Sequence, residues 1–434
     1  MSSAQDQLVT LLKQKGTGKT MSKSLSSDQL SELTDLLQDP QAKLATKSTI
    51  LTAFLMLHNT PEEADWFHLL QRSFHDRVPS ELHFLFQLNM TPSHPFIDLL
   101  QKPIQHHALS EQEMLKALNF LFDNTVPDYY KTAFLEAERL KEETFIENRT
   151  ALDYCWKKAN HYTAKLPLLI DIANPYDGFN RSFNISLFVA PLLASLGYPV
   201  IFHGCEEVSP KKGITLYKLL QAAGKNPLKS PEEVLSDLEN PNIGWSYLDQ
   251  RFSFPELHDL VSLRQDLVKR PVLATIEKFL TPVIPTGKHL LLTGYTHPPY
   301  RQKSIDLLRH LNKADQFMII RGTEGSSQCP LDRRVPMITQ LSHDSLNEAF
   351  SRPGDYNIQE SDRILPDKNI TLEQTLAYGL EGLQNPTSEA FYQLAYNALT
   401  ILKGFNLIDD THLLIKTLKA NVSNHRVLSF WHNV

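Results

Sequence analysis

Residues 166–186 have the sequence LPLLIDIANPYDGFNRSFNIS. The fold prediction depends on this segment, in which an expected strand is followed by an expected helix. The short apolar run 168–173 predicts a buried strand. The segment 174–181 is rich in asparagine, aspartate, proline and glycine, and predicts a tight turn. From Ser182 onward the apolar residues predict a helix that runs to Gly197. The stretch therefore predicts a strand–turn–helix unit.

A strand–turn–helix unit directs backbone N–H groups and the positive end of a helix toward an anion. Ser182, Asn184 and Ser186 stand at the expected helix start, where their side chains could donate hydrogen bonds to a phosphate. The alternative is an N-capped helix behind a tight turn, as found in any α/β domain. The turn alone does not separate the two interpretations.

Composition limits the class of protein. The 434 residues are 41% hydrophobic, which allows a sizeable core and two domains, or one large domain with an appendage. The net charge of -6 argues against a dedicated nucleic-acid binder, because such domains are usually basic. Three cysteines are too few for a disulfide framework and indicate a reducing compartment. With no apolar signal segment at the start and no run long enough to span a membrane, we expect a cytoplasmic protein without membrane contact.

Residues 1–160 read as almost wholly helical and contain a weak internal similarity. Ser26 and Ser110 are each credible N-caps of an amphipathic helix. The run Thr-Ala-Phe-Leu occurs at 52–55 and again at 132–135. The spacings differ, since 52 − 26 = 26 and 132 − 110 = 22. Duplication and coincidence between two helical pairs both remain open.

Two further segments of this region are predicted to be loops. Gly16–Thr20 resembles the end of a phosphate-binding P-loop, but Lys13 occupies the position of the required first glycine. We therefore expect a flexible polar loop there. Pro92, Pro95 and Pro103 indicate a linker or a broken loop between the two similar parts.

Beyond residue 165 the pattern changes to alternating strands and helices. This alternation predicts a mostly parallel sheet flanked by helices. The fold class is therefore α/β, with a helical N-terminal domain at 1–165 and a larger α/β domain at 166–434. The expected strands, after 168–173, are 198–202, 290–294 and 317–320, and the expected helices are 216–223, 304–311, 371–383 and 388–402.

Parallel α/β sheets bind ligands at the loops that follow the carboxyl ends of their strands. Three such loops are expected at 174–181, 203–213 and 321–334. They combine glycines, hydroxyl groups and cationic side chains, which suit a phosphorylated ligand. The alternative is that these loops are polar only because they face solvent.

Specific motifs in and beside the first two of these loops carry a resemblance to a family. They are Asp171-Ile172, the run Ser182-Phe183-Asn184-Ile185-Ser186, His203-Gly204, and Val208-Ser209 followed by Lys211. On these motifs, residues 168–282 resemble the anthranilate phosphoribosyltransferase family, also called glycosyltransferase family 3. The resemblance implies a two-domain layout, a donor site at the strand 168–173 and the helix that follows, and an acceptor carboxylate held by Arg264.

The chain also departs from the pattern of that family. Asn174, Pro175, Tyr176 and Asp177 stand in place of the glycine-rich diphosphate loop, and Phe202 and Cys205 replace the family's lysine and asparagine. Ser326, Ser327 and Gln328 stand where the resemblance implies an Asp-Glu pair that holds magnesium. Without those carboxylates we expect ligand binding to depend little on magnesium, unless Glu206 or Glu324 serves instead. The sequence is that of a divergent branch, and no cofactor is assigned.

Two functions follow from the resemblance. The first is a phosphoribosyltransferase-like enzyme that binds a phosphorylated sugar or nucleotide-like ligand and transfers the pentosyl group to an aromatic or nitrogenous acceptor. The second is a catalytically silent binding protein on the same fold, a version of which would bind nucleic acid, although the acidic net charge disfavours it. No catalytic residue and no metal ligand is assigned. The expected substrate-binding residues are Asp177, Gly178, Asn180, Arg181, Ser182, Asn184, Ser186, His203, Gly204, Ser209, Lys211, Arg264 and Gly325.

The resemblance also implies pairing through the helical domain. Leu30, Leu33 and Leu37 form an apolar stripe that needs a covering surface, so we expect a homodimer with a two-fold interface. The alternative is a monomer in which additional helices of the same chain cover the stripe.

Overall fold

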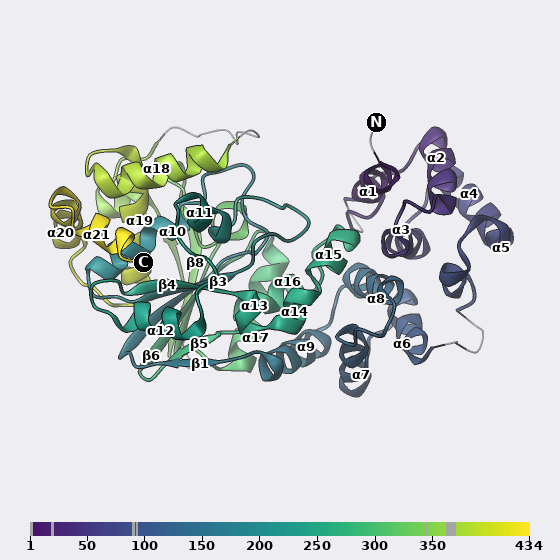
Figure 1. Cartoon of the computed structure of the whole chain (residues 1–434), viewed down its shortest axis with the longest axis horizontal. Helices are drawn as coiled ribbons and strands as arrows, with labels where there is room; N and C mark the ends of the chain where they lie inside the picture. The colour runs from purple at the N-terminus through teal and green to yellow at the C-terminus, as the bar shows by residue number, and fades with distance from the viewer. Residues whose placement is uncertain (1–2, 19–20, 89–91, 93, 343–344, 362–369) are drawn as a thin grey trace. The chain divides into compact units, whose positions relative to one another are not determined.

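The computed structural model divides into two compact units and confirms the α/β class with a helical N-terminal region (Figure 1). It describes residues 3–18, 21–88, 92, 94–342, 345–361 and 370–434. Unit 1 comprises Met1–Cys155 with Asp259–Ile276, and unit 2 comprises Trp156–His258 with Glu277–Val434. Unit 1 thus takes a segment from the middle of the chain. The domain ranges 1–165 and 166–434 stay a prediction.

Unit 1 is built of helices. They are α1 (Ala4–Lys15), α2 (Ser27–Gln38), α3 (Leu44–Met56), α4 (Pro61–Arg72), α5 (Phe74–Arg77), the 3-10 helix η1 (Ser80–Phe86), α6 (Pro95–Ile104), α7 (Glu111–Leu121), α8 (Asp128–Lys141), α9 (Phe145–Lys158, which ends just inside unit 2), α15 (Val261–Leu267) and α16 (Leu273–Ile276). The linker expected around the three prolines is in part wrong. Pro95 opens α6, where a missing N–H does no harm, and Pro103 lies in its last turn. In the segment 16–20, which resembles the end of a P-loop, Gly16 caps the end of α1, while Lys19 and Thr20 lie outside the described residues.

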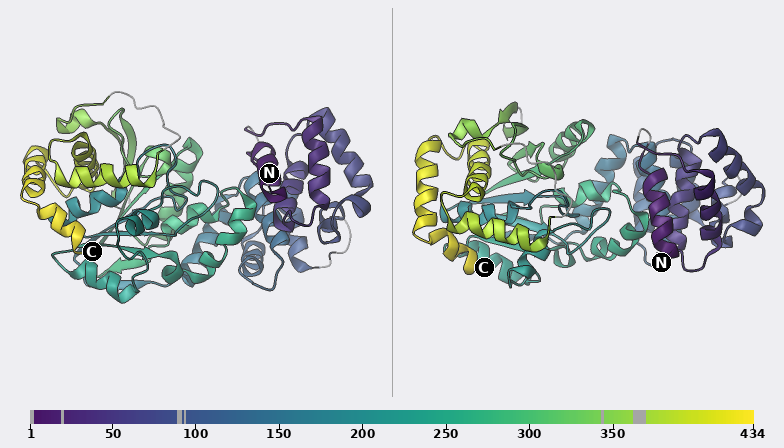
Figure 2. Two further views of the ribbon diagram at one scale, coloured as in Figure 1. Left: turned by 45° about the horizontal axis from the view of Figure 1, so that its top comes forward. Right: turned by 90° about the horizontal axis from the view of Figure 1, so that it is seen from above.

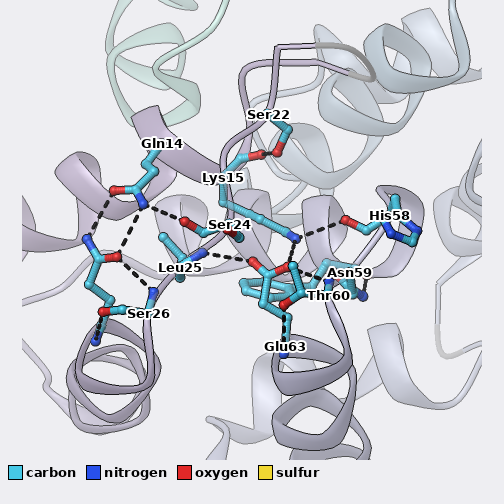
Figure 3. A network of polar contacts seen from close by, with 12 residues as sticks. Gln14, Lys15, Ser22, Ser24, Leu25, Ser26, His58, Asn59, Thr60 and Glu63 are labelled. Carbon is cyan, nitrogen blue, oxygen red and sulfur yellow. Dashed lines mark hydrogen bonds and ion pairs between the residues drawn. The ribbon is translucent and has the colours of Figure 1, made fainter.

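An internal repeat is present in unit 1, with a constant offset of 84 residues. The backbone N–H of Leu25 donates to Glu63 Oε1 at 3.0 Å, and that of Leu109 donates to Glu147 Oε1 at 2.7 Å. The numbers differ by 109 − 25 = 84 and 147 − 63 = 84. The predicted N-caps Ser26 and Ser110, which also differ by 84, are confirmed as capping boxes. We call 25–63 the first repeat and 109–147 the second repeat; Figure 3 shows the polar network of the first.

The corresponding helices α3 and α8 pack on each other with reciprocal hydrogen bonds. Ser48 Oγ donates to the Tyr129 carbonyl at 2.7 Å, and Thr132 Oγ1 donates to the Ala45 carbonyl at 2.9 Å. The two donors differ by 132 − 48 = 84 and the two acceptors by 129 − 45 = 84. Each helix therefore donates from one equivalent position and accepts at the other. This is the pattern of a two-fold interface, formed here within one chain. The match of the Thr-Ala-Phe-Leu runs is wrong by one helical turn, since 132 − 52 = 80.

The apolar stripe of α2 is covered inside unit 1. Leu30, Leu33 and Leu37 are at most 3% exposed in the single chain. The structure therefore supports the alternative in which additional helices cover this stripe, and the stripe no longer requires a second copy.

Unit 2 contains a seven-stranded sheet in the order β4-β3-β2-β6-β7-β8-β9 and a small parallel pair, β1-β5. Strands β4 to β7 in this order are parallel, and β8 and β9 add an antiparallel edge. The bounds are β1 (Tyr162–Ala164), β2 (Leu168–Ala173), β3 (Val200–Gly204), β4 (Trp245–Asp249), β5 (Val283–Pro285), β6 (Lys288–Gly294), β7 (Gln316–Ile320), β8 (Val335–Ser342) and β9 (Ser345–Ser351). The predicted strands correspond to β2, β3, β6 and β7, while β1, β4, β5, β8 and β9 were not predicted.

Helices cover the sheet of unit 2, in layers that follow the alternation of its side chains. Ile170 and Ile172 face a core made with α10, α11 and the C-terminal helices, whereas Leu169, Ile201 and Leu248 face a core made with α12 and the β1-β5 pair. Figure 2 shows the C-terminal helices, coloured yellow-green to yellow, gathered along the sheet. The helices are α10 (Ser186–Ser195), α11 (Leu216–Ala222), α12 (Pro231–Glu239), α13 (Gln250–Ser253), α14 (Pro255–Asp259, which ends at the boundary with unit 1), η2 (Glu277–Phe279), α17 (Pro298–Leu311), η3 (Thr323–Gly325), η4 (Pro353–Tyr356), α18 (Leu372–Gln384), α19 (Glu389–Gly404), α20 (Thr411–Ser423) and α21 (Arg426–His432).

The start of α10 corrects the sequence interpretation. The helix begins at Ser186, not at Ser182. The preceding residues bond to other loops instead of continuing a helix: the Ile185 N–H donates to Gln328 Oε1 at 2.9 Å, and Asn184 Nδ2 donates to the Ile214 carbonyl at 3.0 Å. Tertiary hydrogen bonds thus override the local helical pattern here.

Candidate anion-binding site at the carboxyl edge of the sheet

The turn after β2 lies where the strand order reverses direction. Strand β2 pairs with β3 on one side and with β6 on the other, and such a switch point is the usual ligand position in an open α/β sheet. Two glycines shape this edge. Gly178 has φ +73°, and a Cβ there would lie 2.8 Å from the Ile214 backbone; a Cβ on Gly294 would lie 2.0 Å from the Ser326 backbone. The loops after β2, β3 and β6 therefore approach their neighbours too closely for larger residues.

The structure brings together the three loops expected from the sequence. Ser327 donates through its backbone N–H to Asn174 Oδ1 at 3.1 Å, which joins the third loop to the first. Lys211 Nζ donates to the Gly178 carbonyl at 3.0 Å, which joins the second loop to the first. Lys211 Nζ also donates to the carbonyl of Glu324 in the third loop at 3.2 Å. The loops form one cluster at the carboxyl edge of the sheet.

A carboxylate occupies the centre of this cluster. Glu324 accepts the backbone N–H of Arg181 at 2.8 Å and that of Asn180 at 3.2 Å. Lys211 Nζ lies 2.9 Å from Glu324 Oε2, and the Glu324 side chain is 11% exposed. Two successive N–H groups and an ammonium group around one acceptor form a typical anion site.

Beneath the turn, Asp171 of β2 is buried between two histidines. His203 Nε2 lies 3.2 Å from Asp171 Oδ1, and His289 Nε2 lies 3.5 Å from Asp171 Oδ2. Burial opposes ionisation of Asp171, but the two imidazoles hold the pKa of its carboxyl below the ordinary value. We therefore assign Asp171 as a buried carboxylate that fixes its histidine neighbours.

Tyr176 connects this buried group to the turn. Its hydroxyl contacts His203 Nδ1 and lies 3.2 Å from the Glu277 carbonyl. Burial, followed by the charge of Glu277, raises the pKa of Tyr176 well above the ordinary value, so the phenol stays protonated and can donate. Both ring nitrogens of His203 thus face protein partners, Asp171 and Tyr176. These contacts let His203 hold the turn through Tyr176, and its expected role in substrate binding stays a prediction.

The cavity beside Tyr176 and His203 is small. Its volume is about 10 Å³, room for about one water molecule, whereas pockets for drug-sized ligands span roughly 300–1,000 Å³. It is lined by Asn174, Pro175, Tyr176, Asn184, His203, Gly204, Cys205, Thr215, Leu216 and Tyr247. A larger hollow of about 440 Å³ lies on unit 1 and contains none of the expected substrate-binding residues. Within unit 2, a ligand must therefore bind outside the 10 Å³ cavity or displace part of the loops.

The residues at the expected magnesium position do not fit the ion. Ser326 Oγ donates to the Thr323 carbonyl, and Ser327 Oγ contacts Asn174 Oδ1. Gln328 uses its oxygen for Ile185 and its amide for the Phe183 carbonyl. Magnesium prefers charged oxygen ligands, and within the described ranges no group of three or more His, Cys, Asp or Glu side chains could hold a metal.

The two carboxylates expected as substitute magnesium ligands pair with cationic side chains. Glu206 pairs with Arg251 at 2.8 Å, and Glu324 pairs with Lys211. The weak dependence on magnesium stays a prediction, and the donor chemistry around these loops agrees with it.

Most of the expected substrate-binding residues lie in this cluster, and their role stays a prediction. Asn180, Arg181 and Lys211 surround the Glu324 carboxylate, whereas Asn184, just before α10, and Ser186, its first residue, are buried. Arg264 belongs to α15 of unit 1 and is buried there. The remaining residues lie in the three loops, directly after the first loop, at the end of β3 or in η3; they are Asp177, Gly178, Ser182, His203, Gly204, Ser209 and Gly325.

Sequence reasoning assigned no substrate-binding role to four residues that organise the site, and it considered Glu324 only as a substitute magnesium ligand. They are Glu324, Tyr176, His289 and Gln328. The nearest sequence signal for Glu324 was its position between Thr323 and Gly325, in a loop that already carried two glycines. The other three act through partners more than 25 residues away, which no local pattern reveals.

Sequence comparison finds distant relatives. A protein of Aquifex aeolicus described as uncharacterised is 29% identical over 236 residues, which cover 54% of this chain and 69% of that protein. The anthranilate phosphoribosyltransferase of Cupriavidus metallidurans is 24% identical over 273 residues, covering 62% of this chain and 76% of the enzyme. No protein-family model matches the sequence.

Structural comparison agrees with these relatives on the fold. Anthranilate phosphoribosyltransferase from Saccharomyces cerevisiae, in complex with PRPP and Mg, matches with a TM-score of 0.63 at 14% identity, over 81% of this chain and 98% of the enzyme. The enzyme from Thermus thermophilus matches with a TM-score of 0.59 at 16% identity, over 77% of this chain and 98% of the enzyme. In the part of the chain that the structure describes, no helix has the length and apolarity to cross a membrane.

Proposed function

Because the chain is a divergent relative of the anthranilate phosphoribosyltransferase family, we propose that it binds a phosphorylated ribose ligand at the three-loop cluster. The observation that carries the proposal is the anion site made by the N–H groups of Asn180 and Arg181 and by Lys211. In the chain itself a carboxylate fills this site. A phosphate group has the charge and the acceptor oxygens to use the same donors.

We further propose that binding proceeds without magnesium. Calorimetric titration with phosphoribosyl diphosphate, with and without the ion, tests this. The affinities should differ by less than roughly tenfold, because Ser326, Ser327 and Gln328 offer no carboxylate to a metal. A gain of roughly tenfold or more on adding magnesium contradicts the proposal.

Lys211 offers a matched pair of variants for the same titration. Lys211→Met removes the ammonium of the anion site, whereas Lys212→Met removes its neighbour, which lies 3.7 Å from Glu207. We expect the first variant to weaken binding by roughly tenfold or more and the second to leave it nearly unchanged, since a charge-assisted bond contributes about 1.5–3 kcal/mol. Equal effects of the two variants, or no binding by the unaltered protein, would remove the site.

Transfer of the pentosyl group is the finer part of the proposal. The family's chemistry rests on positioning and charge stabilisation, which this fold can supply without a nucleophile. The 10 Å³ cavity and the poor magnesium fit favour the second candidate, a binding protein without turnover. Release of diphosphate in the presence of aromatic or nitrogenous acceptors distinguishes the two: steady release supports transfer, and binding without release supports the second candidate.

A homodimer stays a prediction for this chain. The apolar stripe of α2 no longer supports the dimer, because Leu30, Leu33 and Leu37 are buried within the single chain. Light scattering over a concentration series tests it, and a monomer mass at every concentration would exclude the dimer.

A further inference from the structure

The anion site of the three-loop cluster already has an occupant from the same chain. The carboxylate of Glu324 accepts the N–H groups of Arg181 at 2.8 Å and Asn180 at 3.2 Å, and it pairs with Lys211 at 2.9 Å. These are donors from both of the other loops. An incoming phosphate would need the same donors, so it and Glu324 compete for one position.

The segment that carries Glu324 has an unusual backbone. Glu324 has φ +52° and ψ +23°, in the left-handed region that non-glycine residues seldom adopt, and Gly325 follows with φ +88°. A non-glycine residue in this region persists where its surroundings stabilise it. Here the contacts of the carboxylate contribute to that stabilisation, together with the bond from Lys211 to the Glu324 carbonyl, so loss of the carboxylate contacts to a competing anion weakens what holds the strained conformation.

From these contacts we infer that Glu324 is a built-in competitor, and that a phosphate-bearing ligand binds by displacing its carboxylate from Asn180, Arg181 and Lys211. The inference rests on the proposed function for the identity of the ligand, but the competition itself concerns any phosphate. It makes Glu324 a residue that limits the affinity of the site for phosphate.

Titration with inorganic phosphate and with diphosphate tests the competition. Glu324→Ala removes the competing carboxylate and should bind both anions at least roughly tenfold more tightly than the unaltered protein. Glu324→Gln keeps the side-chain length but not the charge, and should give a smaller gain. In the double variant Glu324→Ala, Lys211→Met the gain should be lost.

Glu207→Ala is the matched control. It also removes one negative charge from these loops, but Glu207 pairs with Lys218 at 2.7 Å and with Lys212 at 3.7 Å, outside the anion site. Its anion affinity should equal that of the unaltered protein. Thermal melting of each variant confirms that it is folded; Glu324→Gln is decisive if Glu324→Ala does not fold.

The outcomes separate this inference from the proposed function. Tighter phosphate binding by Glu324→Ala without any binding of phosphoribosyl diphosphate upholds the competitor and overturns the ligand assignment. Binding of phosphoribosyl diphosphate by the unaltered protein, with no gain in either Glu324 variant, upholds the ligand and overturns the competitor. An equal gain in Glu207→Ala also overturns the competitor, because the effect would then be one of general charge.

Discussion

In each of the two helical repeats of unit 1, a buried glutamate accepts two backbone N–H groups, and the repeats differ in the lysine that pairs with this glutamate. In the first repeat, Glu63 accepts the N–H groups of Leu25 and Thr60 (Figure 3). In the second, Glu147 accepts those of Leu109 and Thr144. The backbone contacts have been kept because an unsatisfied buried N–H group is costly.

The cation beside each glutamate comes from a different helix. Lys15 of α1 pairs with Glu63 at 2.8 Å and lies over the ring of Phe54. Lys141 of α8 pairs with Glu147 at 2.6 Å and also lies 3.5 Å from Glu138. Phe54 and Glu138 are equivalent positions, since 138 − 54 = 84. The comparison shows that the two repeats share their backbone hydrogen bonds but take the cation that pairs with the glutamate from different helices.

Neutralising the two glutamates should have unequal effects, and this is the largest effect that we expect. Glu63→Gln leaves Lys15 buried without a carboxylate partner, so it should lower the free energy of unfolding by about 3–5 kcal/mol. Glu147→Gln leaves Lys141 beside Glu138, whose pKa falls once the charge of Glu147 is removed, so that Glu138 ionises and supplies the negative charge. The loss should therefore be smaller by about 1–2 kcal/mol. Urea unfolding followed by far-ultraviolet circular dichroism measures both. Equal losses would show that Glu138 does not compensate.

The additional carboxyl group of the second repeat should also give a distinctive pH dependence. Burial, followed by the charge of Glu147, raises the pKa of Glu138 from 4.5 to about 8. The folded state then holds a proton that the unfolded state releases, so this group's contribution to stability is lost as pH rises from about 4.5 to about 8. Glu138→Gln removes this loss, and its stability relative to the unaltered protein should rise by a few kcal/mol over that range, at about 1.4 kcal/mol per pKa unit.

Unfolding of both proteins at pH 4.5 and pH 8 provides the measurement. Other titrating groups act in both proteins and cancel in the difference. Phe54 places no titratable group at the equivalent position, so Phe54→Leu serves as a control that should show no such pH trend. A constant difference for Glu138→Gln across the range would contradict the raised pKa.

The sequence predicted the fold where local pattern and tertiary structure agree. The run 168–173 is β2 with the predicted bounds, because a strand buried on both faces reads as a continuous apolar run. Strand β9 was missed because it is an exposed edge strand with a mixed pattern. The start of α10 was placed four residues too early because Gln328, more than 140 residues away, holds Ile185 outside the helix.

The sequence predicted where the site lies on the sheet, but not which residues contact one another there. The three loops could be placed at one edge because parallel strands bring their carboxyl ends together. That Glu324 would be the partner of Asn180 and Arg181 could not be read, because it depends on a contact across more than 140 residues. The repeat was visible only in part, since its offset of 84 is carried by hydrogen bonds that few identical residues mark.

The smallest effect that we expect tests the internal two-fold relation itself. Ser48→Ala and Thr132→Val each remove one of the reciprocal hydrogen bonds between α3 and α8. If the two repeats form an equivalent interface, each variant should lower the free energy of unfolding by about 1 kcal/mol, and the two losses should agree within about 0.5 kcal/mol. Thr52→Val is the control, because the hydroxyl of Thr52 bonds within its own helix, to the Ser48 carbonyl, and its loss should cost less. If one variant lowers the free energy of unfolding several times more than the other, the two reciprocal hydrogen bonds contribute unequally to stability. The two repeats would then differ at their interface as well as around their glutamates.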